Sequence, residues 1–163
     1  MRMLIAFLFA AFAYVGTAHA STVDLFQRGS CGDPCVVKFN PGGAVVEFIL
    51  VHDLLLTERR MLVVDGPCYS ACSFLADMLR GRNLVCITDK AEMFVHKGSM
   101  QFRSAYLGTM LADIELPYTK DFQSTVDRLG GAPKGKDFRR VAGEDLTGLF
   151  KVCPAKVPSS PVP

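Results

Sequence analysis

The 163-residue chain contains no tryptophan, only three histidines and no run of like charges. Its 18 basic and 16 acidic residues nearly balance, which gives a formal net charge of +2. Because binding to nucleic acid draws on a surplus of positive charge, this balance argues against a nucleic-acid-binding protein. We interpret the one local basic cluster as an ordinary solvated surface. It comprises Lys134, Lys136, Arg139 and Arg140.

Apolar stretches long enough to span a membrane are also lacking after the N-terminus. Residues 1–20 have the pattern of a secretory signal peptide, with the positive Arg2, an apolar run over 4–15 and small residues at Ala18 and Ala20. We therefore expect cleavage after Ala20 and a periplasmic or secreted protein without a stable membrane span. A retained N-terminal anchor is the alternative.

After cleavage, residues 21–153 are long enough to form one domain with its own core. Residues 154–163 hold four of the nine prolines, which predicts a disordered tail. The domain is expected to be α/β, because short apolar runs alternate with helix-like patterns, and such alternation favours a mainly parallel sheet. The expected strands cover 23–28, 36–39, 61–64, 84–88 and 93–95, and the expected helices cover 44–56 and 71–79, with helical pieces in 113–129 and 137–150.

The cysteine pattern lacks any CxxC pair, which argues against a closed zinc site, and no metal or cofactor is expected. An even count of six in an exported chain instead predicts disulfides. Six cysteines allow 15 pairings, among which the sequence does not choose. Cys31 and Cys35 flank a small loop, Cys68 and Cys72 lie one helical turn apart, and Cys86 and Cys153 remain.

Ser70 is the candidate nucleophile. It follows the apolar run 61–64 and the turn signal Gly66-Pro67, and it precedes the helix-like segment 71–79. The first turn of a helix gathers unpaired N–H groups, which can hold an oxyanion while a hydroxyl attacks a carbonyl. The alternative is that Ser70 only caps the helix, a common role for serine.

Two further segments favour the nucleophile. Asn40, Pro41, Gly42 and Gly43 form a Gly-rich turn whose N–H groups can point at a ligand. Downstream, His96 ends a second apolar run and is a candidate general base. Of the other histidines, His19 lies in the signal peptide, and His52 stands beside Asp53 inside an expected helix, where a structural role is the simpler interpretation.

Taken together, these segments resemble the ClpP/crotonase superfamily, and within it the Clp-type serine peptidases. The resemblance covers residues 36–150, with 27 residues between Gly43 and Ser70 and 26 between Ser70 and His96. It implies that Ser70 is the nucleophile, His96 the base, and the N–H groups of Gly43 and Ala71 the oxyanion donors. The similarity of 137–144 to the family's Asp-x-Phe-x-x-Ala-x-Glu stretch implies that Asp137 completes the triad; Asp145 is the fallback.

The chain also departs from that family. Its N-terminal half is shortened, the stretch from His96 to Asp137 is shorter, and Cys68 and Cys72 bracket the serine. Two main hypotheses remain open: an exported serine hydrolase acting on a peptide or ester, and an inactive periplasmic module that binds a protein partner. An acyl-CoA enzyme is a weaker third, because coenzyme A is a cytoplasmic cofactor. The oligomeric state stays open.

Overall fold

A computed structural model describes residues 31–104 and 108–155 of the chain, without the side chains of 99–114. The predicted signal peptide, the strand expected at 23–28 and the last eight residues of the predicted tail lie outside the described residues. The described part is α/β, with small sheets and four helices. Its elements are β1 (Cys35–Val37), α2 (Val45–Thr57), β2 (Leu62–Val64), β3 (Pro67–Tyr69), α3 (Ala71–Arg80), β4 (Val85–Ile87), β5 (Glu92–Val95), β6 (Gly98–Ser104), β7 (Gly108–Ile114), α4 (Lys120–Arg128), β8 (Arg139–Ala142) and α5 (Glu144–Thr147).

The first sheet has the order β1-β2-β4 and is entirely parallel. Its central strand β2 is buried along its whole length, which explains the uninterrupted apolar run in the sequence. The strands and helices expected over residues 36–95 are present within one or two residues of their predicted ends. The parallel α/β prediction is therefore confirmed for this part of the chain.

The second sheet has the order β3-β5-β8, in which β5 pairs parallel with β3 and antiparallel with β8. One mainly parallel sheet is thus present only in part. Strand β3 is not predicted, because Gly66-Pro67 has the composition of a turn. A Cβ atom on Gly66 would collide with the carbonyl oxygen of Lys38, so this glycine lets two backbones pass closely.

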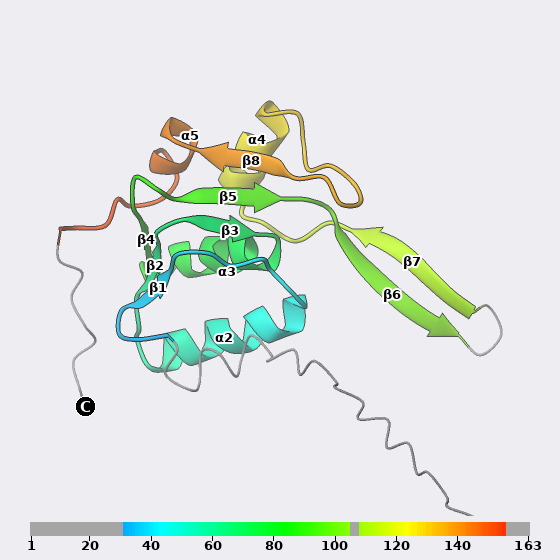
Figure 1. Cartoon of the computed structure of the whole chain (residues 1–163), viewed down its shortest axis with the longest axis horizontal. Helices are drawn as coiled ribbons and strands as arrows, with labels where there is room; N and C mark the ends of the chain where they lie inside the picture. Colours follow the sequence, from blue (N-terminus) through cyan, green and yellow to red (C-terminus); the bar gives the residue numbers. More distant parts are fainter. Residues whose placement is uncertain (1–30, 105–107, 156–163) are drawn as a thin grey trace, which may run out of the picture.

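Strands β6 and β7 form an antiparallel hairpin that projects from the rest of the molecule (Figure 1). Helical structure expected over 113–129 begins only at Lys120, since 113–114 belong to β7. Pro117 precedes α4, where a missing N–H costs nothing. The region 137–150 contains one short helix, as expected, and also the unpredicted strand β8.

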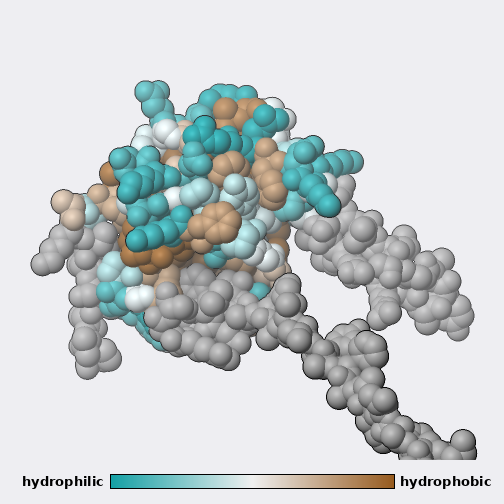
Figure 2. Space-filling model, in the orientation of Figure 1, coloured by the Kyte–Doolittle hydropathy of each residue, from teal (hydrophilic) through white to brown (hydrophobic). Residues whose placement is uncertain are grey.

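Helices cover the strands on two sides. Helix α2 lies below the strands in Figure 1, while α4 and α5 lie above them. Phe48, Val51 and Leu55 form the buried stripe of α2, at a helical spacing, and α2 packs against α3. Hydrophobic residues interrupt the hydrophilic surface of the face shown in Figure 2. Among the residues that the structure describes, Phe39 is the most exposed large apolar side chain, at 64%.

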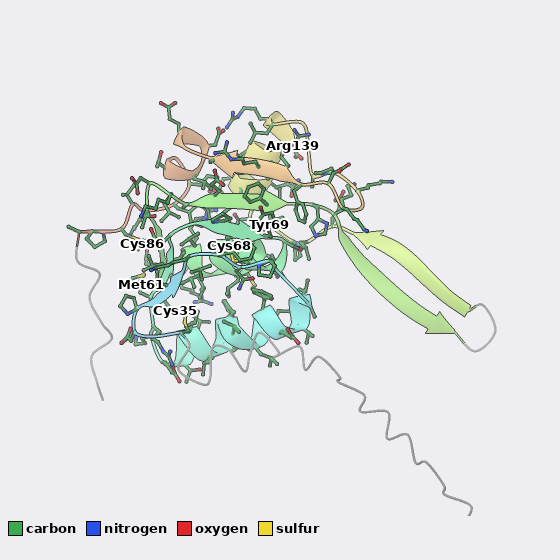
Figure 3. All side chains as sticks on the ribbon, in the orientation of Figure 1. Cys35, Met61, Cys68, Tyr69, Cys86 and Arg139 are labelled. Carbon is green, nitrogen blue, oxygen red and sulfur yellow. A yellow bond between two sulfur atoms is a disulfide. The ribbon has the colours of Figure 1, made fainter. Side chains whose placement is uncertain are left out.

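All six cysteines pair, as Cys31–Cys35, Cys68–Cys72 and Cys86–Cys153, which confirms the disulfide prediction and leaves no thiolate for zinc. Cys35 and Cys86 lie toward the end of the molecule away from the hairpin, whereas Cys68 lies near its middle (Figure 3). Among the described residues, no helix combines the length and the apolar character that crossing a membrane requires.

Candidate active site

Ser70 occupies a strained turn between β3 and α3. Its φ of 51° and ψ of −116° match the first central position of a type II′ turn, a conformation that favours glycine. Such a conformation costs about 1–3 kcal/mol and persists only where the surroundings impose it. Here the Ser70 N–H donates to the carbonyl of Phe94 at 2.7 Å, and the Cys68–Cys72 disulfide closes across the turn.

The side chain of Ser70 does not cap helix α3, although the residue stands at the N-cap position. Its Oγ lies 2.7 Å from Nε2 of His96 instead. Pairing of β3 with β5 explains the contact, because Tyr69 is opposite Phe94 in the parallel register and both candidate residues follow at the same sheet edge. The structure thus brings together the serine and the histidine that the sequence singled out.

The contact of the second ring nitrogen of His96 determines which of the two ring nitrogens carries the hydrogen. Nδ1 lies 3.1 Å from the carbonyl oxygen of Gly135. Because a carbonyl can only accept, Nδ1 must carry the hydrogen and donate it. In the neutral imidazole Nε2 is then the acceptor, so the Ser70 hydroxyl donates to it. This is the tautomer that a general base needs for serine.

Neither predicted carboxylate reaches the imidazole in this structure. Asp137 lies two residues after Gly135 in the loop before β8, is exposed, and makes no hydrogen bond with His96. Asp145, the fallback, accepts a hydrogen bond from Arg128 at 2.6 Å. The backbone carbonyl of Gly135 therefore occupies the place expected for the third triad member.

The Gly-rich turn at 40–43 lies against Ser70. Gly42 has a φ of +81°, and its N–H donates to Oδ1 of Asn40 at 2.8 Å. A Cβ atom on Gly42 would stand 2.7 Å from the carbonyl oxygen of Tyr69 and 2.9 Å from Cβ of Ser70, so only glycine fits. The turn thereby brings the next residue, Gly43, to the site.

Gly43, Ser70 and His96 line one small cavity of about 140 Å³. Within the described residues, neither the N–H of Gly43 nor that of Ala71 donates to a protein acceptor, and Ala71 begins helix α3. Gly43 therefore stands in the cavity with the Ser70 hydroxyl, while Ala71 is buried and directly follows Ser70 in the chain.

Aromatic contacts hold the loop that contains Gly135 and Phe138 against His96. The ring of Phe138 lies 4.7 Å from the imidazole of His96, centroid to centroid. Phe138 also meets Tyr69 edge to face at 5.2 Å, and Tyr69 stacks on Phe94 at 4.2 Å. Aromatic pairs of this kind contribute about 0.5–1.5 kcal/mol each beyond their buried area. The loop that carries the Gly135 carbonyl is thus anchored to β3 and β5.

His96 also lines a second and larger cavity, of about 240 Å³. It shares His96 and Leu116 with the smaller cavity, so the two are neighbours. The larger cavity is further lined by Lys97, Glu115, Tyr118, Gln123, Asp127, Gly131 and Ala132. Sequence reasoning missed all of these residues, because they come from segments whose packing no local pattern reveals.

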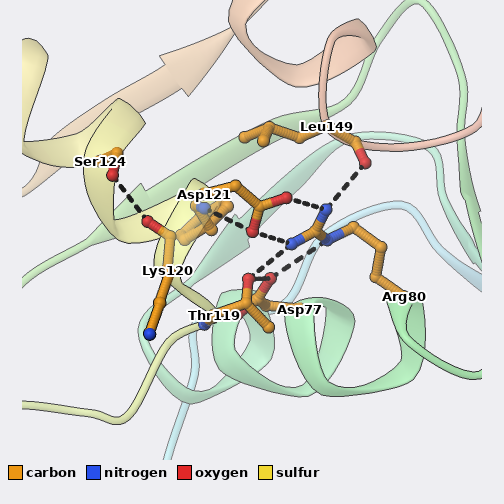
Figure 4. Close-up of polar contacts among 8 residues, drawn as sticks. Asp77, Arg80, Thr119, Lys120, Asp121, Ser124 and Leu149 are labelled. Atoms are coloured by element: carbon orange, nitrogen blue, oxygen red, sulfur yellow. Dashed lines mark hydrogen bonds and ion pairs between the residues drawn. The ribbon is translucent and has the colours of Figure 1, made fainter.

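A polar cluster around the buried Asp77 positions helix α4 (Figure 4), and Gln123 and Asp127 of this helix line the larger cavity. The carboxylate of Asp77, only 1% exposed, accepts from the N–H of Thr119 at 2.6 Å and from its hydroxyl at 2.7 Å. Arg80 contacts Asp77 and forms a two-pronged pair with Asp121. The cluster therefore links α3 to the start of α4.

Charges and burial around the cluster of Asp77, Arg80 and Asp121 shift three pKa values. Hydrogen bonds from Arg80 hold the pKa of Asp121 well below its usual range, and those with Asp121 raise the pKa of Arg80. Burial raises the pKa of Tyr118, whose hydroxyl has no hydrogen-bond partner among the described residues. Tyr118 therefore stays protonated at neutral pH.

The other candidate pair, His52 and Asp53, does not belong to the site around Ser70 and His96. His52 Nδ1 contacts Oδ1 of its neighbour Asp53 at 3.0 Å on helix α2, and neither residue lines the two cavities. The described residues also contain no group of His, Cys, Asp and Glu that could hold a metal ion.

No protein-family model, curated protein or solved structure matches this chain.

Proposed function

We propose that this protein is an exported serine hydrolase that cleaves peptide or ester bonds with Ser70 as nucleophile and His96 as general base. One observation carries the proposal. The Gly135 carbonyl directs the proton of His96 to Nδ1, so that Nε2, at 2.7 Å from Oγ, faces Ser70 as an acceptor.

In the reaction, Oγ of Ser70 attacks the substrate carbonyl carbon while Nε2 of His96 takes the hydroxyl proton. The carbonyl oxygen becomes an oxyanion, which the N–H groups of Gly43 and Ala71 stabilise. Each such donor contributes about 3 kcal/mol to transition-state binding. The imidazolium then returns the proton to the leaving amine or alcohol. Water, activated by His96 in the same way, releases the acyl group from Ser70.

The proposal places the protein in the ClpP/crotonase superfamily and in the periplasm or outside the cell. The superfamily assignment is supported by the strained turn at Ser70, which lies between a strand and a helix and beside a Gly-rich turn. Three disulfides are compatible with a location in the periplasm or outside the cell, since such bonds persist in oxidising compartments. Asp137 stays a predicted triad member, which would have to replace Gly135 as the partner of Nδ1.

A catalytically inactive binding module is the second candidate. The observation in its favour is that a neutral carbonyl, and not a carboxylate, contacts His96. A carbonyl orients the imidazole but offers less stabilisation to the imidazolium than a carboxylate does. The two candidates therefore differ in the reactivity of Ser70 and not in its position.

Labelling with a fluorophosphonate tests the proposal. We expect the oxidised mature protein to react covalently at Ser70, and Ser70→Ala to abolish the reaction. Ser124→Ala is the matched control, because Ser124 is an exposed serine on α4 that lies outside both cavities. Folded wild-type protein that stays unlabelled would support the inactive module.

A further inference from the structure

The larger cavity adjoins the smaller cavity beside the candidate nucleophile. Ser70, His96 and Leu116 line the smaller one. His96 and Leu116 also line the larger one. The larger cavity is therefore the neighbour of the cavity that Ser70 lines.

The size of this cavity suits one amino-acid side chain. Its volume is about 240 Å³, below the roughly 300–1,000 Å³ of sites that enclose a whole small molecule. Leu116 and Ala132 supply apolar wall to the cavity. Apolar wall of this kind suits the methylene stem of a long side chain whose end is polar.

The charged groups of the lining do not balance. Lys97 and Glu115 form an ion pair with a nitrogen–oxygen distance of 2.8 Å, so their charges offset each other. Asp127 receives a hydrogen bond at 2.9 Å from Gln123, a neutral donor. Among the described residues, no cation forms a salt bridge with Asp127. The cavity therefore has one carboxylate in excess.

Tyr118 also lines the cavity. Its hydroxyl is buried and has no hydrogen-bond partner in the described part of the chain. Buried hydroxyls are almost always paired, and an exception calls for an explanation. This hydroxyl is closed off from solvent and lies near enough to Asp77 for that charge to help raise the pKa of Tyr118, so it adds no charge to the cavity.

We propose that this cavity is the pocket for a substrate side chain that ends in a cation, as in lysine or arginine, and that Asp127 is its counter-charge. This assignment rests on the proposed hydrolase function, in which Ser70 is the nucleophile, but binding in the pocket can be measured without turnover. Leu116 and Ala132 hold the stem, while Asp127 accepts from the ammonium or guanidinium group.

Paired substrates test the preference for charge. N-acetyl thioesters of arginine and of citrulline have side chains of the same length, but only arginine is charged. We expect kcat/KM to be about tenfold higher for the arginine thioester, a usual size for a charge-assisted hydrogen bond. Asp127→Asn should bring the two values together. Asp89→Asn removes an exposed carboxylate outside the cavity and should leave the ratio unchanged.

Glu115→Gln is a second variant in case Asp127→Asn fails to fold. The Glu115 side chain is 78% exposed, and the substitution removes one negative charge from the lining. We expect it also to lower the ratio between arginine and citrulline. Equal ratios in the wild type and both variants, with hydrolysis intact, would overturn the pocket assignment.

Calorimetric binding of N-acetylarginine amide to Ser70→Ala separates this proposal from the proposed function. Saturable binding that Asp127→Asn weakens about tenfold supports the pocket even in a protein that fluorophosphonate does not label. Binding that does not distinguish the arginine amide from the citrulline amide overturns the pocket, whatever the result of labelling.

Discussion

Tyr69 and Phe94 are register partners in a parallel strand pair; Ser70 directly follows Tyr69, and His96 stands two residues beyond Phe94, at the same edge. The Ser70 N–H donates to the Phe94 carbonyl, so the backbone holds the two side chains within 2.7 Å of each other. A 26-residue separation in sequence thus becomes a direct contact through two short strands. The geometry depends on backbone pairing, which substitution of either side chain leaves in place.

The first prediction concerns turnover. Ser70→Ala and His96→Ala should each lower kcat by about 10⁴-fold or more on an activated ester, because either change removes the proton-transfer pair. The double variant should be no worse than the worse single variant, since the two residues act as a unit. Steady-state kinetics of the three variants checks this. Effects that multiply would mean that the two side chains act independently.

The second prediction separates Gly135 from Asp137. Since the Gly135 carbonyl contacts Nδ1, Asp137→Asn should lower kcat less than about tenfold, whereas loss of a working triad carboxylate costs about 10⁴-fold. Gly135→Ala should lower kcat more than Asp137→Asn does, because the φ of +73° is strained for alanine and the loop would move its carbonyl.

Gly143→Ala is the control for the effect of placing alanine at a position with a positive φ. Gly143 also has a positive φ, of 58°, and open space where a Cβ would stand, but it lies in neither cavity. It should lose similar stability to Gly135→Ala without losing kcat. A large loss of kcat in Asp137→Asn would show that the loop rearranges in the working enzyme and that Asp137 joins the triad.

Much of the fold was predictable where the chain follows local rules. The buried runs at 61–64 and 84–88 predict strands, and the stripe at Phe48, Val51 and Leu55 fits a helix packed on one face. Strand β3 was missed because its three residues include Pro67 and Cys68 and follow a glycine. Its pairing with β5 depends on partners distant in sequence, which short patterns do not encode.

The candidate site likewise contains some residues that the sequence indicates and others that only the folded chain reveals. Ser70, His96 and the Gly-rich turn could be predicted, because each stands at the junction between a strand and a turn. The role of the Gly135 carbonyl could not be, since every residue has a carbonyl and only the folded loop selects one. The larger cavity depends on how α4 packs, which in turn depends on the buried contact between Asp77 and Thr119.

The third prediction compares two disulfides. Cys86–Cys153 joins residues 67 apart, whereas Cys31–Cys35 joins residues only four apart. By loop-closure entropy, the long-range bridge contributes about 4 kcal/mol and the short one about 2 kcal/mol to the free energy of unfolding. Alanine at both positions of each pair, followed by urea unfolding, measures the difference. Equal losses would contradict an origin in chain entropy.

The fourth prediction concerns Asp77. Asp77→Ala should lower the free energy of unfolding by about 3 kcal/mol or more, because it leaves the Thr119 N–H without its acceptor and Arg80 with one carboxylate fewer. Asp145→Ala is the control, since its pair with the exposed Arg128 should contribute only about 0–1 kcal/mol. Urea unfolding of both variants checks the contrast, and similar losses would contradict it.

The fifth prediction concerns pH and Asp121. Arg80 holds the pKa of the folded Asp121 well below the value of about 3.9 found in unfolded chains. The carboxylate therefore contributes its full stability above about pH 4, and this contribution falls as the pH drops, because the unfolded chain takes up the proton first. The side chain of Asp121 is 58% exposed, so solvent screening limits the contribution to about 0–1 kcal/mol.

Urea unfolding of the wild type and Asp121→Asn at several pH values measures that contribution as a difference. We expect the wild type to be more stable by a constant amount from pH 5 to pH 8, and the difference to shrink toward zero near pH 2. The comparison isolates Asp121, because Asp77 also contacts Arg80 and is present in both proteins. A difference that stays constant down to pH 2, or that grows, would mean that the Arg80 pair does not stabilise the fold through the charge of Asp121.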